Sequence, residues 1–373
     1  MIGRVFGIVS AFLFFSIFLP FTVFGQEGTQ AQAVRPEQFE AQIVAISDET
    51  FTDLAGNKSA GQKIDLQVNS GRLSNQRITI TYIPVGESRV YTVGDRVYVG
   101  VSRGLEGGET YFIADYIRRM PLYLLFGLFV GVVVFIARKR GVASLLGMGV
   151  SFLVIFFFLL PQISGGANPI LIAIASSLFI IPLTFYSSHG INRKTTSAVI
   201  GTLITLIITG LLALFFVEAT KLSGFASEEA AFVKAAKGEL INIKGLLLAG
   251  MLIGILGVLD DITVAQANVV YQLKKASSSL HTGELYARAM EVGKDHIASM
   301  VNTLILVYTG AALPLLLLFL NNSAPFSEVI NYEVVAEEIV RTLVASIGLV
   351  LAVPITTYIS AVMISQKELS IKN

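Results

Sequence analysis

The chain has 373 residues, of which 54% are hydrophobic and 14% charged, with a mean hydropathy of +0.71 and a formal net charge of +1. Soluble domains carry about 25% charged residues, so this composition excludes an ordinary soluble globular protein. The near-zero net charge gives no reason to expect a nucleic-acid partner. The absence of cysteine excludes disulfides and thiolate metal sites.

Residues 1–25 have the layout of a secretory signal peptide. They contain a single basic residue, Arg4, then an apolar stretch, and small residues at Val23 and Gly25 before polar sequence begins. Because the apolar stretch is long for a signal peptide, an N-terminal anchor that is not cleaved is the alternative. Both interpretations carry the following residues across a membrane.

Residues 26–117 are predicted to form a small all-β extracytoplasmic domain. Five stretches, at 39–48, 62–71, 76–88, 91–104 and 108–117, alternate apolar and polar residues and are punctuated by Gly, Asn, Ser and Asp. Five short strands most economically close into a barrel or an OB-like fold, which removes exposed edges. OB folds often bind nucleic acid, but no basic stripe with interleaved aromatics is present, so no nucleic-acid partner is expected for this domain.

Residues 118–373 are predicted to form an α-helical, polytopic transmembrane domain. About seven apolar runs occur, each long enough to cross about 30 Å of hydrocarbon at about 1.5 Å per residue. They lie at 121–137, 143–160, 169–187, 196–217, 245–264, 300–320 and 340–363.

The connections between these runs predict the orientation in the membrane, since lysine and arginine collect on the cytoplasmic side. The connections after the first, third and fifth runs are basic, whereas residues 161–169 and 321–338 contain neither lysine nor arginine. This alternation places the β-domain outside and the C-terminus in the cytoplasm. Arg118 and Arg119 lie on the outer side against the rule, but a translocated domain upstream weakens such local signals. The basic residues are Arg138, Lys139, Arg140, Arg193, Lys194, Lys274 and Lys275.

Near its end the fifth run contains two adjacent carboxylates, Asp260 and Asp261, after fifteen residues without an ionisable side chain. A charge at the bilayer centre costs about 2.5 to 3.5 kcal/mol on insertion scales, so these groups should face the bundle interior or a water-filled vestibule. Thr263, Gln266 and Asn268 follow at helical spacings. On a helix, one stripe holds Asp261, Ala265, Asn268 and Gln272. The alternative is that the span ends at Leu259 and the acids lie at the membrane interface.

A second polar segment leads into the sixth run. Asp295, Ser299 and Asn302 share one helical face, and His296, Met300 and Thr303 form the adjacent stripe. Both segments are predicted at the same depth on the cytoplasmic side, which favours one shared polar site. If Asp260, Asp261 and Asp295 lie close together, their oxygens suit Mg²⁺, Ca²⁺ or Na⁺. The candidate residues are Asp260, Asp261, Thr263, Gln266, Asn268, Asp295, His296, Asn302 and Thr303.

Known catalytic motifs do not fit the acid pair. A prenyl-phosphate site needs DDxxD, but Val264 occupies the last position, and an intramembrane aspartyl protease needs a glycine where Leu259 stands. No nucleophile elbow, zincin motif or P-loop occurs. We therefore expect no enzyme activity and no cofactor.

The segments 254–273 and 293–319, followed by 337–357, resemble the YibE/F-like family of bacterial membrane proteins. The Asp-Asp-x-Thr block at 260–263 and the Asp-His block at 295–296 carry the resemblance. It implies a multipass protein of the bacterial cytoplasmic membrane and supplies no substrate.

Two functions remain open from the sequence. One is a permease or channel-like transporter of a small solute or ion, with the acidic site lining its inner vestibule. The other is a non-transporting sensor or assembly scaffold, in which the β-domain binds a partner and the polar groups hold helices together.

Overall fold

The computed structural model describes residues 37–52, 58–82, 91–103, 108–320 and 325–365. The predicted signal peptide or anchor, residues 1–25, lies outside these ranges. The chain forms two compact units that divide between Val132 and Val133, and each is described by itself. On the sequence, the predicted boundary at 117/118 falls between the last strand, which ends at Tyr116, and the first helix, which begins at Arg119.

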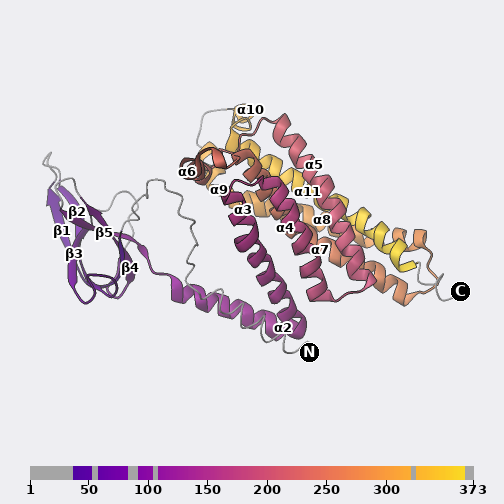
Figure 1. The fold of residues 1–373 in the computed structure, drawn as a ribbon, viewed down its shortest axis with the longest axis horizontal. Coiled ribbons are helices and arrows are strands. Elements are labelled where there is room, and N and C mark those ends of the chain that lie inside the picture. The colour runs from indigo at the N-terminus through magenta and orange to yellow at the C-terminus, as the bar shows by residue number, and fades with distance from the viewer. Residues whose placement is uncertain (1–36, 53–57, 83–90, 104–107, 321–324, 366–373) are drawn as a thin grey trace. The chain divides into compact units, whose positions relative to one another are not determined.

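The first unit contains a five-stranded antiparallel sheet (Figure 1), which confirms the predicted number of strands. The strands are β1 (Gln38–Thr52), β2 (Lys58–Val68), β3 (Arg77–Tyr82), β4 (Arg96–Arg103) and β5 (Glu109–Tyr116), in the order β3-β2-β1-β4-β5. β1 is long enough to pair with β4 through its first residues and with β2 along the rest, and a bulge lies between Ile43 and Ala45.

Alternation along the strands produces the core of the sheet. Every second residue is buried from Phe39 to Ile43 of β1, from Ile64 to Val68 of β2 and from Val97 to Val99 of β4, because successive side chains point to opposite faces. The fully or almost fully buried side chains are Phe39, Ala41, Ile43, Ile64, Leu66, Val68, Val97 and Val99.

The second unit is helical. Its elements, with α2 shared between the units, are α2 (Arg119–Val154), η1 (Ile155–Leu159), α3 (Leu160–Ser164), α4 (Pro169–His189), α5 (Arg193–Ala219), α6 (Glu228–Lys237), η2 (Gly238–Leu240), α7 (Ile243–Ala276), α8 (Thr282–Ala311), α9 (Leu313–Leu320), α10 (Phe326–Val329) and α11 (Glu333–Ser365). Asparagine caps begin three of the long helices: Asn168, Asn192 and Asn242 each accept hydrogen bonds from backbone amides of the first turn.

Within the described residues, five helical stretches are long and apolar enough to cross a membrane, or six if the bent pair α8–α9 counts as one span. The seven predicted apolar runs therefore do not each correspond to one separate helix. The runs at 121–137 and 143–160 fall in one stretch, Arg119–Ser164, and the run at 300–320 falls on α8 and α9, which meet at 69°.

The long first stretch is broken in two places for local reasons. Arg138 has φ 49° and ψ −127°, which interrupts α2 between its two apolar halves. This left-handed φ is strained for a residue with a side chain. Farther along, the π-helical turn η1 precedes Pro161, whose missing amide hydrogen cannot continue the α-helical ladder.

Helix α7 is the central element of the bundle, since it packs against α4, α5, α8 and α11. Small residues bring α5 and α11 especially close: Ser360 Oγ donates to Ser197 Oγ at 2.8 Å. A Cβ at Gly348 would lie 2.6 Å from Thr209 Oγ1. Close approach at small residues is typical of helix packing in membranes.

Candidate functional site

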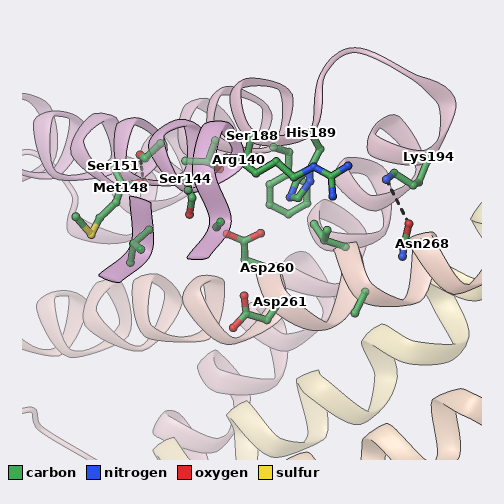
Figure 2. A pocket seen from close by; sticks show the side chains of 18 of the residues that line it. Arg140, Ser144, Met148, Ser151, Ser188, His189, Lys194, Asp260, Asp261 and Asn268 are labelled. Carbon is green, nitrogen blue, oxygen red and sulfur yellow. Dashed lines mark hydrogen bonds between the residues drawn. The ribbon is translucent and has the colours of Figure 1, made fainter. Parts of the chain in front are cut away.

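A cavity of about 900 Å³ opens between α2, α4, the start of α5 and α7. It is lined by the acid pair of α7 and, from the other helices, by basic and hydroxyl side chains (Figure 2). Its size lies within the range of about 300 to 1,000 Å³ that is usual for small-molecule sites. The cavity is therefore the candidate functional site.

Asp260 and Asp261 reach this cavity from one turn of α7, and Figure 2 shows the Asp260 carboxyl group projecting toward α2. Asp260 is half-buried and Asp261 is exposed. Neither carboxyl group forms a hydrogen bond or an ion pair with any residue in the described ranges. A half-buried carboxylate without a partner in the protein is costly, which makes both groups available to a ligand, a proton or water.

The face of α7 that carries Asp261 also lines the cavity toward the C-terminal end of the helix. Asp261, Ala265, Asn268 and Gln272 all line it, as the helical spacing of these residues requires. Lys194 at the start of α5 donates a hydrogen bond from Nζ to Asn268 Oδ1 at 3.4 Å and lies 5.8 Å from the ring centroid of Tyr271. These contacts hold the Lys194 ammonium at the cavity wall.

Helices α2 and α4 supply the opposite wall. Arg140, Ser144 and Ser151 lie on one face of α2, at spacings of four and seven residues. Ser188 and His189 belong to the last turn of α4. Gly147 of α2 faces α4, since a Cβ there would lie in ordinary contact with Ser188 Oγ at 3.5 Å.

The sequence pattern alone did not identify these residues of α2, α4 and α5 as part of a site. Arg140 and Lys194 served only as markers of the cytoplasmic side, and the serines and His189 were not singled out. Their regular spacing on α2 was a usable signal, since Arg140, Ser144 and Ser151 share a helical face in an otherwise apolar segment.

Thr263 and Gln266 lie away from the cavity, buried between helices. Thr263 Oγ1 and Thr202 Oγ1 are 2.7 Å apart, which joins α7 to α5. Gln266 Nε2 donates to Thr357 Oγ1 at 2.7 Å and to the Ala289 carbonyl oxygen at 2.9 Å, which joins α7 to α11 and α8. These two predicted site residues connect helices.

The second predicted block, on α8, does not line this cavity. Asp295, Asn302 and Thr303 are exposed, and Thr303 donates to the Ser299 carbonyl of its own helix. His296 is half-buried, with Nδ1 buried and without a hydrogen-bond partner. Among the residues that the structure describes, no three His, Asp or Glu side chains form a group that could hold a metal.

The burial pattern of α8 accounts for this placement. Leu285, Ala289 and Gly293, spaced four residues apart, are buried against the bundle. A Cβ at Gly293 would lie 2.5 Å from Val353 Cγ1 and 3.0 Å from Gln266 Nε2. This small-residue face fixes the rotation of α8, and the Asp295 face then points away.

A family model described as YibE/F-like protein matches residues 125–366. The match covers well over half of the 373-residue chain and includes every helix that lines the cavity. It confirms the resemblance drawn from the two acidic blocks. No curated protein and no solved structure matches the chain.

Proposed function

We propose that this chain, which belongs to the YibE/F-like family, is a multipass membrane permease for a small solute or ion that uses the cavity at Asp260 and Asp261. The observation that supports this function is the acid pair itself. Two adjacent carboxylates open into a cavity of about 900 Å³ within a bundle of apolar helices and have no protein partner within the described residues. Ionisable groups within apolar, membrane-spanning helices mark ion or solute pathways in membrane proteins.

Helix lengths support seven membrane crossings. The stretch Arg119–Ser164 has 46 residues, which at about 1.5 Å per residue is roughly twice the thickness of the hydrocarbon core. The interruption at Arg138 divides it into two segments of spanning length. With the bent pair α8–α9 counted as one crossing, these lengths support the proposal of seven crossings.

The distribution of basic residues supports an orientation in the bacterial cytoplasmic membrane. Arg140, Lys194 and Lys274 lie at the end of the bundle where α4 stops, α5 starts and α7 stops. By the positive-inside rule this end faces the cytoplasm. The β-unit is then extracytoplasmic. The sheet order β3-β2-β1-β4-β5 supports the proposal of an OB-like barrel, and we propose a protein partner for this unit.

A second candidate, a non-transporting sensor or scaffold, is favoured by a different observation. Thr263 and Gln266 hold α7 to three neighbouring helices through short hydrogen bonds. In a scaffold these contacts and the acid pair would all serve stability. In a permease only the acid pair would govern flux.

Flux measurements separate the two functions. The purified full chain is reconstituted in vesicles and tested with a panel of protons, Na⁺, K⁺, Mg²⁺ and small zwitterions. The double variant Asp260→Asn/Asp261→Asn is expected to lose flux while keeping its helical circular dichroism. Asp295→Asn is the matched control, because that carboxylate is exposed outside the cavity, and it should retain flux. Equal flux in both variants would refute the permease.

A further inference from the structure

The cavity contains charges of both signs that do not neutralise one another directly. Arg140 of α2 and Lys194 of α5 line it together with Asp260 and Asp261 of α7. Within the described residues, none of these four side chains has an oppositely charged nitrogen or oxygen within 4.0 Å. Figure 2 shows the guanidinium group of Arg140 and the two carboxylates on different walls.

We propose that this cavity binds a small zwitterion, with a primary ammonium group at Asp260 and Asp261 and an acidic group at Arg140. The inference rests on the proposed function, since it names the solute class of the same cavity. The formal charges of these four side chains sum to zero. A ligand with both charges therefore satisfies both walls at once, so that neither wall keeps an uncompensated charge beside hydrocarbon, where such a charge is costly.

The side chains have the donors and acceptors that such a ligand needs. Carboxylates accept hydrogen bonds from an ammonium group, and arginine donates a pair of hydrogen bonds to a carboxylate or phosphate. Lys194 is already engaged by Asn268 and Tyr271, so Arg140 is the free cationic group. Ser144 and Ser188 add hydroxyl groups on the same wall as Arg140.

Two sources can supply this chemistry. One is a free solute such as phosphoethanolamine, and the other is the headgroup of phosphatidylethanolamine, which carries the same primary ammonium group beside a phosphodiester. Phosphatidylcholine serves as the reference lipid, because its quaternary ammonium has no hydrogen to donate to the aspartates.

The test uses the full chain in nanodiscs of phosphatidylcholine. Phosphoethanolamine is titrated in and binding is followed by calorimetry, with ethanolamine and inorganic phosphate as half-ligands. We expect each half-ligand to bind at least about tenfold more weakly, since each loses a set of charge-assisted hydrogen bonds. A second arm adds phosphatidylethanolamine to the discs. Competition with the free solute identifies the headgroup as a ligand, and unchanged binding identifies the free solute.

Substitutions test whether the ligand binds at Arg140 and the acid pair. Arg140→Gln and Asp260→Asn/Asp261→Asn are each expected to weaken phosphoethanolamine binding about tenfold or more. Lys139→Gln and Asp295→Asn are the matched controls, because neither residue lines the cavity, and they should bind as the wild type does. The half-ligand comparison needs no variant, so it remains decisive if a variant fails to fold.

Three results would overturn the inference. One is the absence of binding in both lipid arms, and another is equal affinity for phosphate and phosphoethanolamine, which marks an anion site. The third is equal affinity for ethanolamine and phosphoethanolamine, which marks a cation site. Cation flux without zwitterion binding would refute this inference and leave the permease intact, whereas binding without any flux would refute the permease alone.

Discussion

Gly201 of α5 lies directly against Thr356 of α11, so closely that a Cβ at position 201 would overlap Thr356 Oγ1 and lie 3.1 Å from Thr356 Cβ. This contact is one of a regular series between the antiparallel helices α5 and α11. Ser197 meets Ser360 one turn away, and Thr209 meets Gly348 two turns away in the other direction. Small residues at every fourth position of both helices allow their backbones to approach.

Gly201→Ala is expected to destabilise the bundle by about 1 to 3 kcal/mol, the usual cost of overpacking. The added methyl group has no space, because backbone and side chain of Thr356 both lie within contact distance. Thermal unfolding in detergent, followed by circular dichroism, measures the loss. Gly257→Ala on α7 is the control, since a Cβ there meets nothing within 4 Å, and it should not lower the unfolding temperature.

The same contact predicts partial rescue by Thr356→Ala. The Thr356 hydroxyl is buried without a hydrogen-bond partner, so its removal costs little and vacates the space that the new methyl group requires. The double variant should therefore be more stable than Gly201→Ala alone, which a double-mutant cycle measures. Additive losses would show that the two residues do not share this contact.

The β-sheet could be predicted from local pattern, and the breaks and bends of the apolar helices could not. Alternation is a property of each strand, so five strands follow from the residues themselves. Apolar runs show which segments enter a membrane but not where a helix bends or continues. The interruption at Arg138 and the 69° bend between α8 and α9 depend on backbone geometry, which composition does not encode.

The α7 wall of the candidate site could be inferred for a similar reason. The stripe of α7 from Asp261 to Gln272 follows from helical periodicity and lines the cavity. The rotation of α8 is a tertiary property, set by the packing of Ala289 and Gly293 against α7 and α11. Equal depth in the membrane therefore gave no information about which way Asp295 faces.

Gln266→Leu is expected to lower the free energy of unfolding by about 1 kcal/mol. The substitution keeps the side-chain volume but removes the hydrogen bonds to Thr357 and to the Ala289 carbonyl, and interhelical bonds in membranes contribute about 0.6 to 2 kcal/mol. Gln272→Leu, on the exposed part of the same helix, is the matched control. Faster amide exchange along α8 in the Gln266 variant alone would locate the effect. Equal stability of the two variants would contradict this role.

Arg341→Gln is expected to destabilise α11 and its neighbours by about 3 kcal/mol. Arg341 pairs with Glu337 and donates to Glu338 Oε1 at 2.9 Å. Glu337 is only 8% exposed, so removal of its partner leaves a buried charge uncompensated. Breaking a buried ion pair costs about 3 to 5 kcal/mol. We expect the lower value for Arg341→Gln because the Arg341 side chain is 32% exposed. Glu337→Gln/Arg341→Gln should recover most of the loss in the same unfolding assay, and a double variant as unstable as the single would exclude an electrostatic cause.

The β-unit offers a prediction on pH. Burial and a hydrogen bond of 3.0 Å to Glu109 Oε2 raise the pKa of the Tyr111 phenol above its ordinary value of about 10. Arg72 lies beside the same carboxylate, with Nη2 2.5 Å from Oε2, and opposes this rise in the Tyr111 pKa. Because the folded pKa is raised, the contribution of Tyr111 to stability is complete below pH 10 or so. It is lost as the pH rises through the folded pKa.

The phenolate absorbance of the full chain, taken as the difference between wild type and Tyr111→Phe, measures this pKa. Glu109→Gln should shift the titration of Tyr111 down toward that of an ordinary tyrosine, because it removes the negative charge that disfavours the phenolate. Arg72→Gln should shift it further up, because it removes the positive charge that favours the phenolate. The opposite signs of the two shifts are the test, since general loosening of the sheet would move both variants toward the ordinary tyrosine value.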